Sequence, residues 1–278
     1  MKKGWKIFWV TIAGVAILGI ICGCISLALG VSVKDLDSDF DIRDVTVVEK
    51  RIPVATDGSE YQYEFQDITD LDMCVRACEV IIQTRNTDTV QIDTSELNYE
   101  TLGLELFVEE KDGKLVIQTT KDGELCKGHH LKNREGGILS VYIPEDMNLS
   151  TANFELGGCV FEMSGLNIDQ MSLTLGAVEG DMEHMTLHSL FAEVGAGELE
   201  YSGAITGNAE IVCGTGEVDL ELSGTKEEFN YELSVGMGAI EIGEMEYGGF
   251  AMDKNIDNQA QKNMRIDCGV GNVSVDFK

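Results

Sequence analysis

Residues 192–201 read AEVGAGELEY, and residues 211–220, one step of 19 residues further along, read IVCGTGEVDL. In both stretches apolar and polar residues alternate on either side of a glycine turn, which is typical of two half-buried strands joined by a tight bend. Residues 173–182, LTLGAVEGDM, carry the same pattern one step earlier. The sequence therefore predicts an array of strand-turn-strand units of equal length.

The first glycine of each unit defines the extent of the array. These glycines are Gly157, Gly176, Gly195, Gly214, Gly236 and Gly269, with successive spacings of 19, 19, 19, 22 and 33 residues. The array thus begins with a strict period and later takes insertions. The longest insertion, around Gly243–Asn263, is polar and contains glycine, so we expect a loop there. Consecutive units are expected to stack one upon the next.

Equivalent positions of the units carry the same class of residue. One residue before the glycine stand Leu156, Leu175, Val194, Cys213, Val235 and Cys268. Four residues after it stand Phe161, Gly180, Leu199, Val218, Ile240 and Val273, with Gly180 as the exception. One unit cannot bury its apolar side alone, but units stacked at the inter-strand spacing of ~4.8 Å form a continuous core. The predicted fold is all-β, a β-solenoid of stacked rungs of ~19 residues; the equal steps favour it over a β-sandwich.

Residues 35–150 form an N-terminal β region before the array at 151–278. The expected strands in this region are 45–48, 61–65, 75–83, 90–92, 102–108, 114–119 and 138–143. Asp112 and Gly113 lie between two alternating runs, LELFVEE and KLVIQTT, which predicts a two-residue hairpin turn.

The N-terminus carries a membrane signal. Between Lys6 and Lys34 lie 27 uncharged residues, long enough for a helix to cross a bilayer. We expect a transmembrane helix over residues 7–33, preceded by a cytoplasmic tail at 1–6, because the lysines of the tail favour the cytoplasmic side. A cleaved signal peptide and a lipoprotein signal ending at Cys24 are the alternatives. All three place the remainder of the chain outside the cytoplasm, and the first makes it a single-pass protein of the cell membrane.

The charge of the chain excludes some partners. The formal net charge is -29, and residues 35–278 hold 16 basic and 49 acidic side chains. Such a surface repels the phosphates of nucleic acids and of anionic lipids, so neither is expected as a partner. Cationic partners or metal ions suit it better.

Acidic residues recur three and five positions after the turn glycine, where side chains point outward. They are Glu179, Asp181, Glu198, Glu200, Glu217 and Asp219, followed by Glu241 alone. Stacked rungs place these like charges side by side, where they repel one another. Bound Ca²⁺ or a cationic partner would offset the repulsion, and we take the six carboxylates as the candidate metal or cation stripe. The alternative is a water-exposed face on which salt screens the repulsion. No other cofactor is expected.

Six cysteines lie outside the predicted membrane helix, a number that permits three disulfides in an exported domain. Cys74 and Cys78 are the best candidate pair. Cys213 and Cys268 occupy an apolar position of the repeat, so they are expected to act as small buried hydrophobes. The sequence has no nucleophile elbow, phosphate-binding loop or zinc-ribbon spacing, and we do not expect an enzyme.

Four stretches together resemble one bacterial family. They are MKKGWKIFW at 1–9, DGKLVIQTT at 112–120, GILSVYIPEDMNLS at 137–150 and IDCGVGNVSVDF at 266–277. Over roughly residues 40–278 the chain is similar to the "putative adhesin" domain of unknown function, a β-strand repeat family related to the toast-rack domains of envelope-stress proteins. The resemblance implies a β-solenoid anchored at the bacterial envelope and exposed outside it. The family has no established catalytic residues, so none is assigned here.

These observations lead to three expectations for function. The first is an adhesin-like interaction module at the envelope, with a cell-wall component, a matrix or another membrane protein as partner. The second is an envelope-stress sensor or regulatory subunit that works through a membrane partner, since six residues before the helix leave little to signal with. The third is a passive spacer or self-assembling rod.

Overall fold

The computed structural model describes residues 62–99, 102–121, 124–125 and 136–278. In these ranges the chain is all-β, apart from a short 3₁₀ turn, η4 (Lys226–Glu228). The predicted tail at 1–6, membrane helix at 7–33 and strand at 45–48 lie outside the described residues. Within the described ranges, no helix has the length and apolar character needed to cross a membrane.

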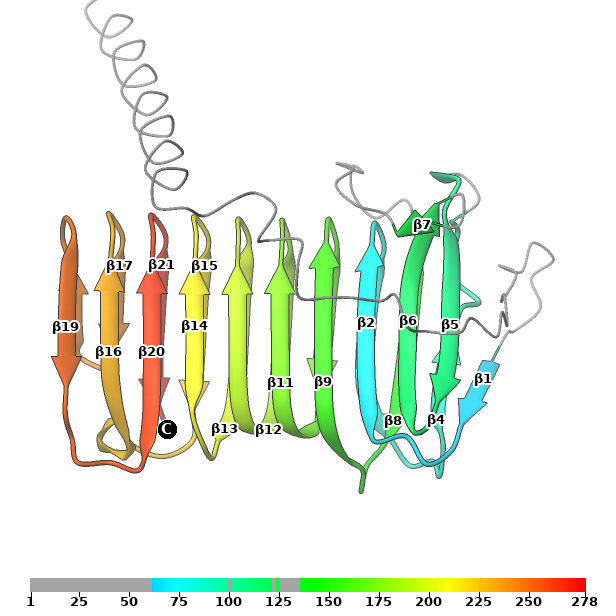
Figure 1. The fold of residues 1–278 in the computed structure, drawn as a ribbon, viewed down its shortest axis with the longest axis horizontal. Coiled ribbons are helices and arrows are strands. Elements are labelled where there is room, and N and C mark those ends of the chain that lie inside the picture. Colours follow the sequence, from blue (N-terminus) through cyan, green and yellow to red (C-terminus); the bar gives the residue numbers. More distant parts are fainter. Residues whose placement is uncertain (1–61, 100–101, 122–123, 126–135) are drawn as a thin grey trace, which may run out of the picture. The chain divides into compact units, whose positions relative to one another are not determined.

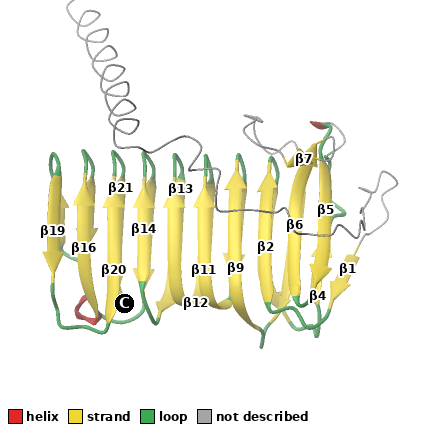
Figure 2. Cartoon of the chain, viewed as in Figure 1, coloured by secondary structure: helices red, strands yellow, loops and turns green. Residues whose placement is uncertain are grey.

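The strands form two facing layers of one hydrogen-bonded sheet (Figure 1, Figure 2). The first layer faces the viewer in Figure 1. Its strands, from neighbour to neighbour, are β5 (Glu105–Lys111), β6 (Lys114–Lys121), β2 (Asp70–Arg76), β9 (Asn148–Gly157), β11 (Asn167–Leu175), the second half of β12 (Glu179–Val194), β14 (Ala209–Cys213), β20 (Lys262–Cys268), β16 (Phe229–Val235) and β19 (Met252–Ile256). The short β7 (Glu124–Leu125) pairs with β6.

The second layer lies behind the first and follows the same plan. Its strands, in neighbour order, are β1 (Gln62–Phe65), β4 (Val90–Asp93), β8 (Ile138–Pro144), β3 (Glu79–Arg85), β10 (Val160–Ser164), the first half of β12, β13 (Glu198–Ile205), β15 (Glu217–Leu222), β21 (Asn272–Phe277), β17 (Ala239–Ile242) and β18 (Met245–Gly248). The inner strands of both layers are parallel, and antiparallel strands end each layer on both sides.

β12 passes from the second layer into the first. Its first half pairs with β10 and β13, and its second half pairs with β11 and β14. The register shifts between Met182 and Met185, and His184 there has a φ of 55°, so a bulge bends the strand around the core. The bend carries the sheet from one layer to the other without a break in the strand.

The core lies between the layers and is built from every second residue. On β11, Met171, Leu173 and Leu175 are buried, while Ser172 and Thr174 between them point outward. The column expected before the turn glycine is present: Leu175 pairs with Leu156 on one side and with Val194 on the other. The column continues through Cys213, and all of these side chains are buried.

The stacking order differs from the order of the chain. Cys213 pairs with Cys268, and Cys268 pairs with Val235, so the last unit of the sequence lies between the two that precede it. The expectation that consecutive units stack one upon the next is therefore wrong at Gly236 and Gly269. Any two rungs of this array present matching apolar columns and backbone edges, so the sequence pattern does not distinguish the two orders.

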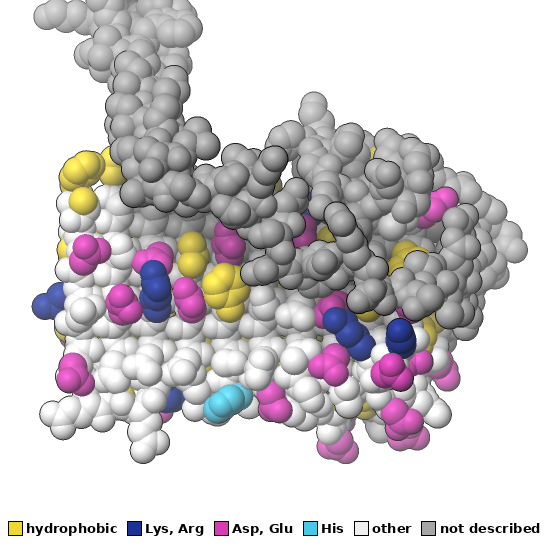
Figure 3. Space-filling view, in the orientation of Figure 1, with side chains coloured by type: hydrophobic (Ala, Val, Ile, Leu, Met, Phe, Trp, Pro, Cys, Tyr) yellow, Lys and Arg dark blue, Asp and Glu magenta, His cyan; other side chains and the backbone are white. Residues whose placement is uncertain are grey.

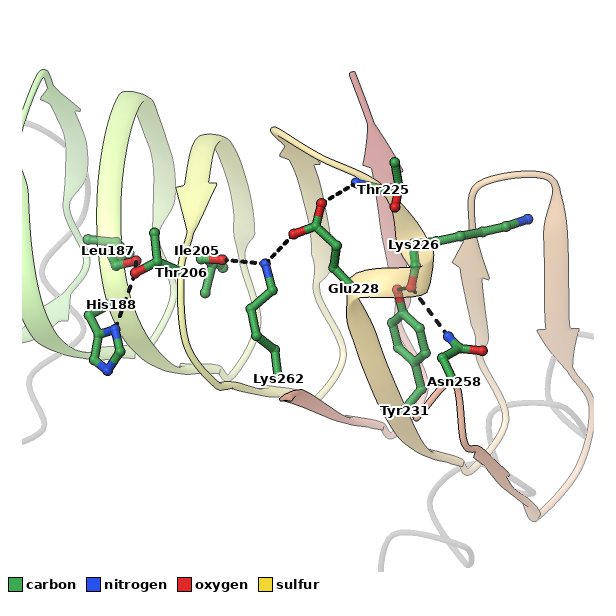
Figure 4. A network of polar contacts seen from close by, with 10 residues as sticks. All are labelled: Leu187, His188, Ile205, Thr206, Thr225, Lys226, Glu228, Tyr231, Asn258 and Lys262. Carbon is green, nitrogen blue, oxygen red and sulfur yellow. Dashed lines mark hydrogen bonds and ion pairs between the residues drawn. The ribbon is translucent and has the colours of Figure 1, made fainter. Parts of the chain in front are cut away.

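A polar network ties the start of the inserted strand β20 to the segments that precede its two neighbours, β14 and β16 (Figure 4). The Lys262 ammonium donates to the carbonyl oxygen of Ile205 at 3.2 Å and to a Glu228 carboxylate oxygen at 2.7 Å. The other oxygen of Glu228 accepts from the backbone N–H of Thr225 at 3.2 Å. Lys262 thus links the end of β13 to η4, and these contacts favour the inserted order.

The long insertion is not a loop. The structure forms β18 and β19 within Gly243–Asn263, and these strands pair antiparallel with β17 and β16. The last rung would otherwise expose a row of unpaired backbone N–H and C=O groups. The insertion therefore caps one end of the array, which its polar composition did not reveal.

The N-terminal region contributes a rung that the glycine pattern missed. The sequence predicted one strand over 75–83, but the chain turns there, and β2 and β3 pair in parallel with β9 and β10. Ala77 at this turn has a φ of 65°, close to the 64° of its counterpart Gly158. Because Ala77 stands at this turn in place of a glycine, the glycine pattern of the sequence did not reveal the turn. The hairpin at Asp112 and Gly113 is confirmed, with φ of 53° and 82° between β5 and β6.

Gly180 is explained by its neighbour. Gly180 pairs with Phe161 on β10, and a Cβ added to Gly180 would lie 2.1 Å from Cε1 of the Phe161 ring. The ring fills the space that an apolar side chain occupies in the other rungs, and it is fully buried. The Phe161 side chain therefore fills the core space at its own position and at the position of Gly180.

Candidate functional site

The six candidate carboxylates lie on the outward face of the second layer. β12 carries Glu179 and Asp181, and its neighbour β13 carries Glu198 and Glu200, which pair with them directly. On β15, Glu217 and Asp219 pair with the two residues of β13. The six therefore form two columns of three, separated along each column by the strand spacing of ~4.8 Å. The structure places these residues as the sequence predicted.

The insertion of β21 ends both columns. Asn272 lies beside Glu217, and Ser274 lies beside Asp219, so two neutral residues follow the acidic ones. Glu241, which follows the six carboxylates in the repeat pattern, lies beyond Ser274 and does not extend the stripe. At the opposite end, Glu162 of β10 pairs with Asp181 and extends one column. Sequence reasoning missed Glu162, although its place one residue after Phe161 corresponds to that of Asp181 after Gly180.

Among the residues that the structure describes, none of the six carboxylates forms an ion pair. The Lys and Arg side chains that form ion pairs in the described ranges bind other acids: Arg76 pairs with Glu155, Lys114 with Asp72, Lys262 with Glu228, Arg265 with Glu210 and Asp267, and Lys278 with Glu221. In the first layer, acidic and basic side chains lie together over β14 and β20 (Figure 3). Within the ranges described, the stripe in the second layer therefore has no compensating ion pair.

Two carboxyl groups of the stripe have raised pKa values, for which burial is the first cause and neighbouring negative charge the second. Burial, and next the charge of Glu183, raises the pKa of Asp181 above its usual range. For Asp219, burial comes first, followed by the charges of Glu217 and Glu200, and the pKa is again raised. A raised carboxyl pKa means that the ionised form is disfavoured in the folded chain. Cations near the columns would relieve this cost.

A shallow groove runs beside the first column, along the glycine turns. It has a volume of about 1170 Å³ and is open to solvent. Glu179, Glu198 and Glu217 line it, together with turn residues such as Ala196 and Gly197. Three carboxylates of one column therefore line the same open groove, where one elongated partner would contact all three.

The arrangement does not form a metal cage. Within the described ranges, no group of three or more His, Cys, Asp or Glu side chains is arranged to hold a metal ion. The six carboxylates lie in rows, whereas Ca²⁺ takes six to eight oxygen ligands around one point. Binding of Ca²⁺ by Glu179, Asp181, Glu198, Glu200, Glu217 and Asp219 stays a prediction, and the rows suit a partner with several separated positive charges better.

The structure rearranges the cysteines relative to expectation. Cys74 pairs with Glu155 on the outward side of β2, whereas Cys78 is buried beyond the turn, so the expected Cys74–Cys78 pair is wrong. Cys78 instead lies next to Cys159, and Cys213 lies next to Cys268. Burial of the last two agrees with their expected role as small hydrophobes.

The comparisons with known proteins concern the fold. No family model matches the chain. No curated protein matches it either. Among solved structures, the chain is similar to a putative cell adhesion protein from Clostridium sporogenes, with 15% identity, a TM-score of 0.43, and coverage of 79% of this chain and 99% of that one.

Two further structures show a comparable likeness. A putative adhesin from Bacteroides fragilis has 11% identity and a TM-score of 0.32, covering 78% of this chain and 96% of that one. A putative lipid binding protein from Parabacteroides distasonis has 12% identity and a TM-score of 0.39, covering 79% and 97%. At this level of likeness nothing about partners follows, and the function of this chain is inferred from its own residues.

Proposed function

We propose that this chain is an adhesin-like interaction module of the bacterial envelope, anchored in the cell membrane by residues 7–33 with its β-solenoid outside the cytoplasm. The acidic stripe is its contact surface, and the partner carries repeated amino or guanidinium groups. The observation behind this proposal is that, in the described part of the chain, none of the six stripe carboxylates has an ion-pair partner.

The geometry supports a multivalent contact. Each exposed ion pair contributes little by itself, on the order of 0.2–1 kcal/mol. Rows of carboxylates at ~4.8 Å spacing let one extended partner make several such contacts at once. A cationic segment of a wall-associated or membrane protein fits these rows, because its side chains can follow the groove along the turns. Nucleic acid and anionic lipid do not fit, since both would add like charge.

Binding of a fluorescent lysine-rich peptide to the full chain in detergent micelles tests the stripe. The stripe variant carries Glu179→Gln, Glu198→Gln and Glu217→Gln, the column that lines the groove. The control variant removes the same number of charges at exposed positions elsewhere, with Glu105→Gln, Glu145→Gln and Glu193→Gln. We expect the stripe variant to bind roughly 10-fold more weakly and with a smaller dependence on salt, and the control to bind as the unaltered chain does.

Equal losses in both variants would mean that net charge, and not the stripe, attracts the peptide. A glutamate-rich peptide should not bind to any of the three proteins. Calcium is tested separately: millimolar Ca²⁺ should raise the melting temperature of the unaltered chain more than that of the stripe variant. Protease treatment of intact cells tests the proposed location. The β-solenoid should be digested if it lies outside the cytoplasm and should stay intact if it lies inside.

A further inference from the structure

The fold brings Cys78 and Cys159 together although 81 positions separate them in the sequence. Each follows a turn residue with positive φ, Ala77 or Gly158, and each precedes a strand of the second layer. The residues directly after them, Glu79 and Val160, are paired across adjacent parallel strands. Neighbouring parallel strands hold equivalent Cα atoms ~4.8 Å apart, which lies within the ~4.4–6.8 Å that a disulfide spans.

The two sulfur atoms share a buried polar pocket. The thiol of Cys78 hydrogen-bonds to the sulfur of Cys159, and the Tyr99 hydroxyl donates to the Cys78 sulfur at 3.1 Å. The Cys159 thiol lies 3.3 Å from the carbonyl oxygen of Val75. Cys78 is 1% exposed and Cys159 is 5% exposed, but Cys159 also lines the open groove along the turns. One sulfur is therefore within reach of a reagent in the groove, and the second lies behind it.

Cys213 and Cys268 are also hydrogen-bonded neighbours, but each thiol in addition contacts its own glycine turn. The Cys213 thiol donates to the carbonyl of Gly216 at 3.2 Å, and the Cys268 thiol donates to that of Gly271 at 3.0 Å. Each points into its own glycine turn, and neither lines the groove. Cys213 and Cys268 therefore serve as the control pair in the test of Cys78 and Cys159.

We propose that Cys78 and Cys159 form a disulfide that joins the Ala77 turn to the first glycine turn of the array. The bond would fasten the N-terminal rung of β2 and β3 to the rung of β9 and β10. The inference does not depend on which partner the acidic stripe binds.

The chemistry requires a disulfide oxidant, such as oxidised glutathione, that enters from the groove. The hydrogen bond from Cys78, aided by nearby backbone N–H groups, lowers the pKa of Cys159 to about 7, so its thiolate is present at neutral pH. That thiolate attacks one glutathione sulfur, the glutathione S–S bond breaks, and a glutathione thiolate leaves. Cys78 then loses its proton and attacks the Cys159 sulfur, which releases the second glutathione. Two protein thiols are oxidised, and one glutathione disulfide is reduced to two thiols.

The test is mass spectrometry of the full chain in detergent micelles, incubated with oxidised glutathione and digested without reduction. We expect a peptide pair linked through Cys78 and Cys159, lighter than the sum of the two peptides by two hydrogen atoms. Oxidation should raise the melting temperature by roughly 5–10 °C, and a thiol reductant should reverse the rise. A Cys213→Ser and Cys268→Ser variant should keep the whole rise, and Cys159→Ser should lose it.

Two results would overturn the proposal. One is that both thiols stay available to a thiol-alkylating reagent after oxidation of the folded chain, or that either is found bonded to a different cysteine. The other is that the rise in melting temperature persists in the Cys159→Ser variant. The peptide mapping uses the unaltered protein, so it decides the matter even where a serine variant fails to fold.

Discussion

Gly180→Ala is expected to destabilise the fold far more than an exposed glycine-to-alanine change does. The added Cβ would lie 2.1 Å from Cε1 of Phe161, whereas carbon atoms in contact are ~3.5–4.0 Å apart. The Phe161 ring is fully buried, so it cannot turn out into solvent without leaving the core. Gly176→Ala provides the matched control, because its Cβ would meet no atom closer than 3.7 Å.

The magnitude follows from the packing of the pair. Overfilling a close-packed core costs about 1–3 kcal/mol, so Gly180→Ala should lower the free energy of unfolding by that amount. For a domain of this size, ~2 kcal/mol corresponds to a loss of roughly 4–8 °C in melting temperature. Phe161→Leu alone should also destabilise, by about 1–3 kcal/mol, because it leaves a cavity beside Gly180. The double variant should be less destabilised than the sum of the two, with a coupling of about 1–3 kcal/mol.

Urea unfolding followed by circular dichroism measures all four proteins, together with the Gly176→Ala control. The control should unfold within about 0.5 kcal/mol of the unaltered chain. Equal stability of Gly180→Ala and Gly176→Ala would refute the assignment of Phe161 to the space above Gly180. Strict additivity of the double variant would refute it as well.

Three further predictions concern charge. Lys262→Met should lower the melting temperature because it removes the contacts to Ile205 and Glu228, and Lys254→Met, at an exposed position, is the control. The hydrogen bond from Lys262 lowers the pKa of Glu228. The ionised Glu228 therefore contributes fully to the stability of the fold above pH 4.5, and this contribution is lost as the pH falls through the lowered pKa. In the Glu228→Gln variant, the melting temperature should depend less on pH in that range. Burial, and next the charge of neighbouring carboxylates, raises the pKa of Asp219. The stability of the fold therefore falls as the pH rises from 3.8 through the raised pKa. Asp219→Asn should raise the melting temperature at pH 7 by about 1–3 °C. A lower melting temperature for Asp219→Asn at pH 7 would contradict the reading of the stripe as self-repelling.

In the periodic part of the array, the sequence by itself determined which residues form strands and which side of each strand faces the core. Side chains of a strand alternate between two faces, so the polar and apolar alternation around Gly195 and Gly214 assigns Val194 to the core and Glu198 to the surface without any knowledge of neighbours. The step of 19 residues then placed the carboxylates of β12, β13 and β15 in two columns. The candidate stripe was predictable for the same reason, because period and alternation are local properties.

The tertiary structure alone decided which rung lies next to which. Every rung offers the same backbone edge and a matching apolar column, so the order must be chosen by contacts between segments far apart in the chain. β20 pairs with β14 and β16, and Lys262 at its start bonds to Ile205 and Glu228. β18 and β19 then pair with β17 and β16 and cover the edges that remain. That order separates Glu241 from the stripe and brings Cys213 to Cys268. The turn at Ala77 brings Cys78 to Cys159 in the same way, since pairing between distant strands is set by long-range hydrogen bonds and not by the period of the sequence.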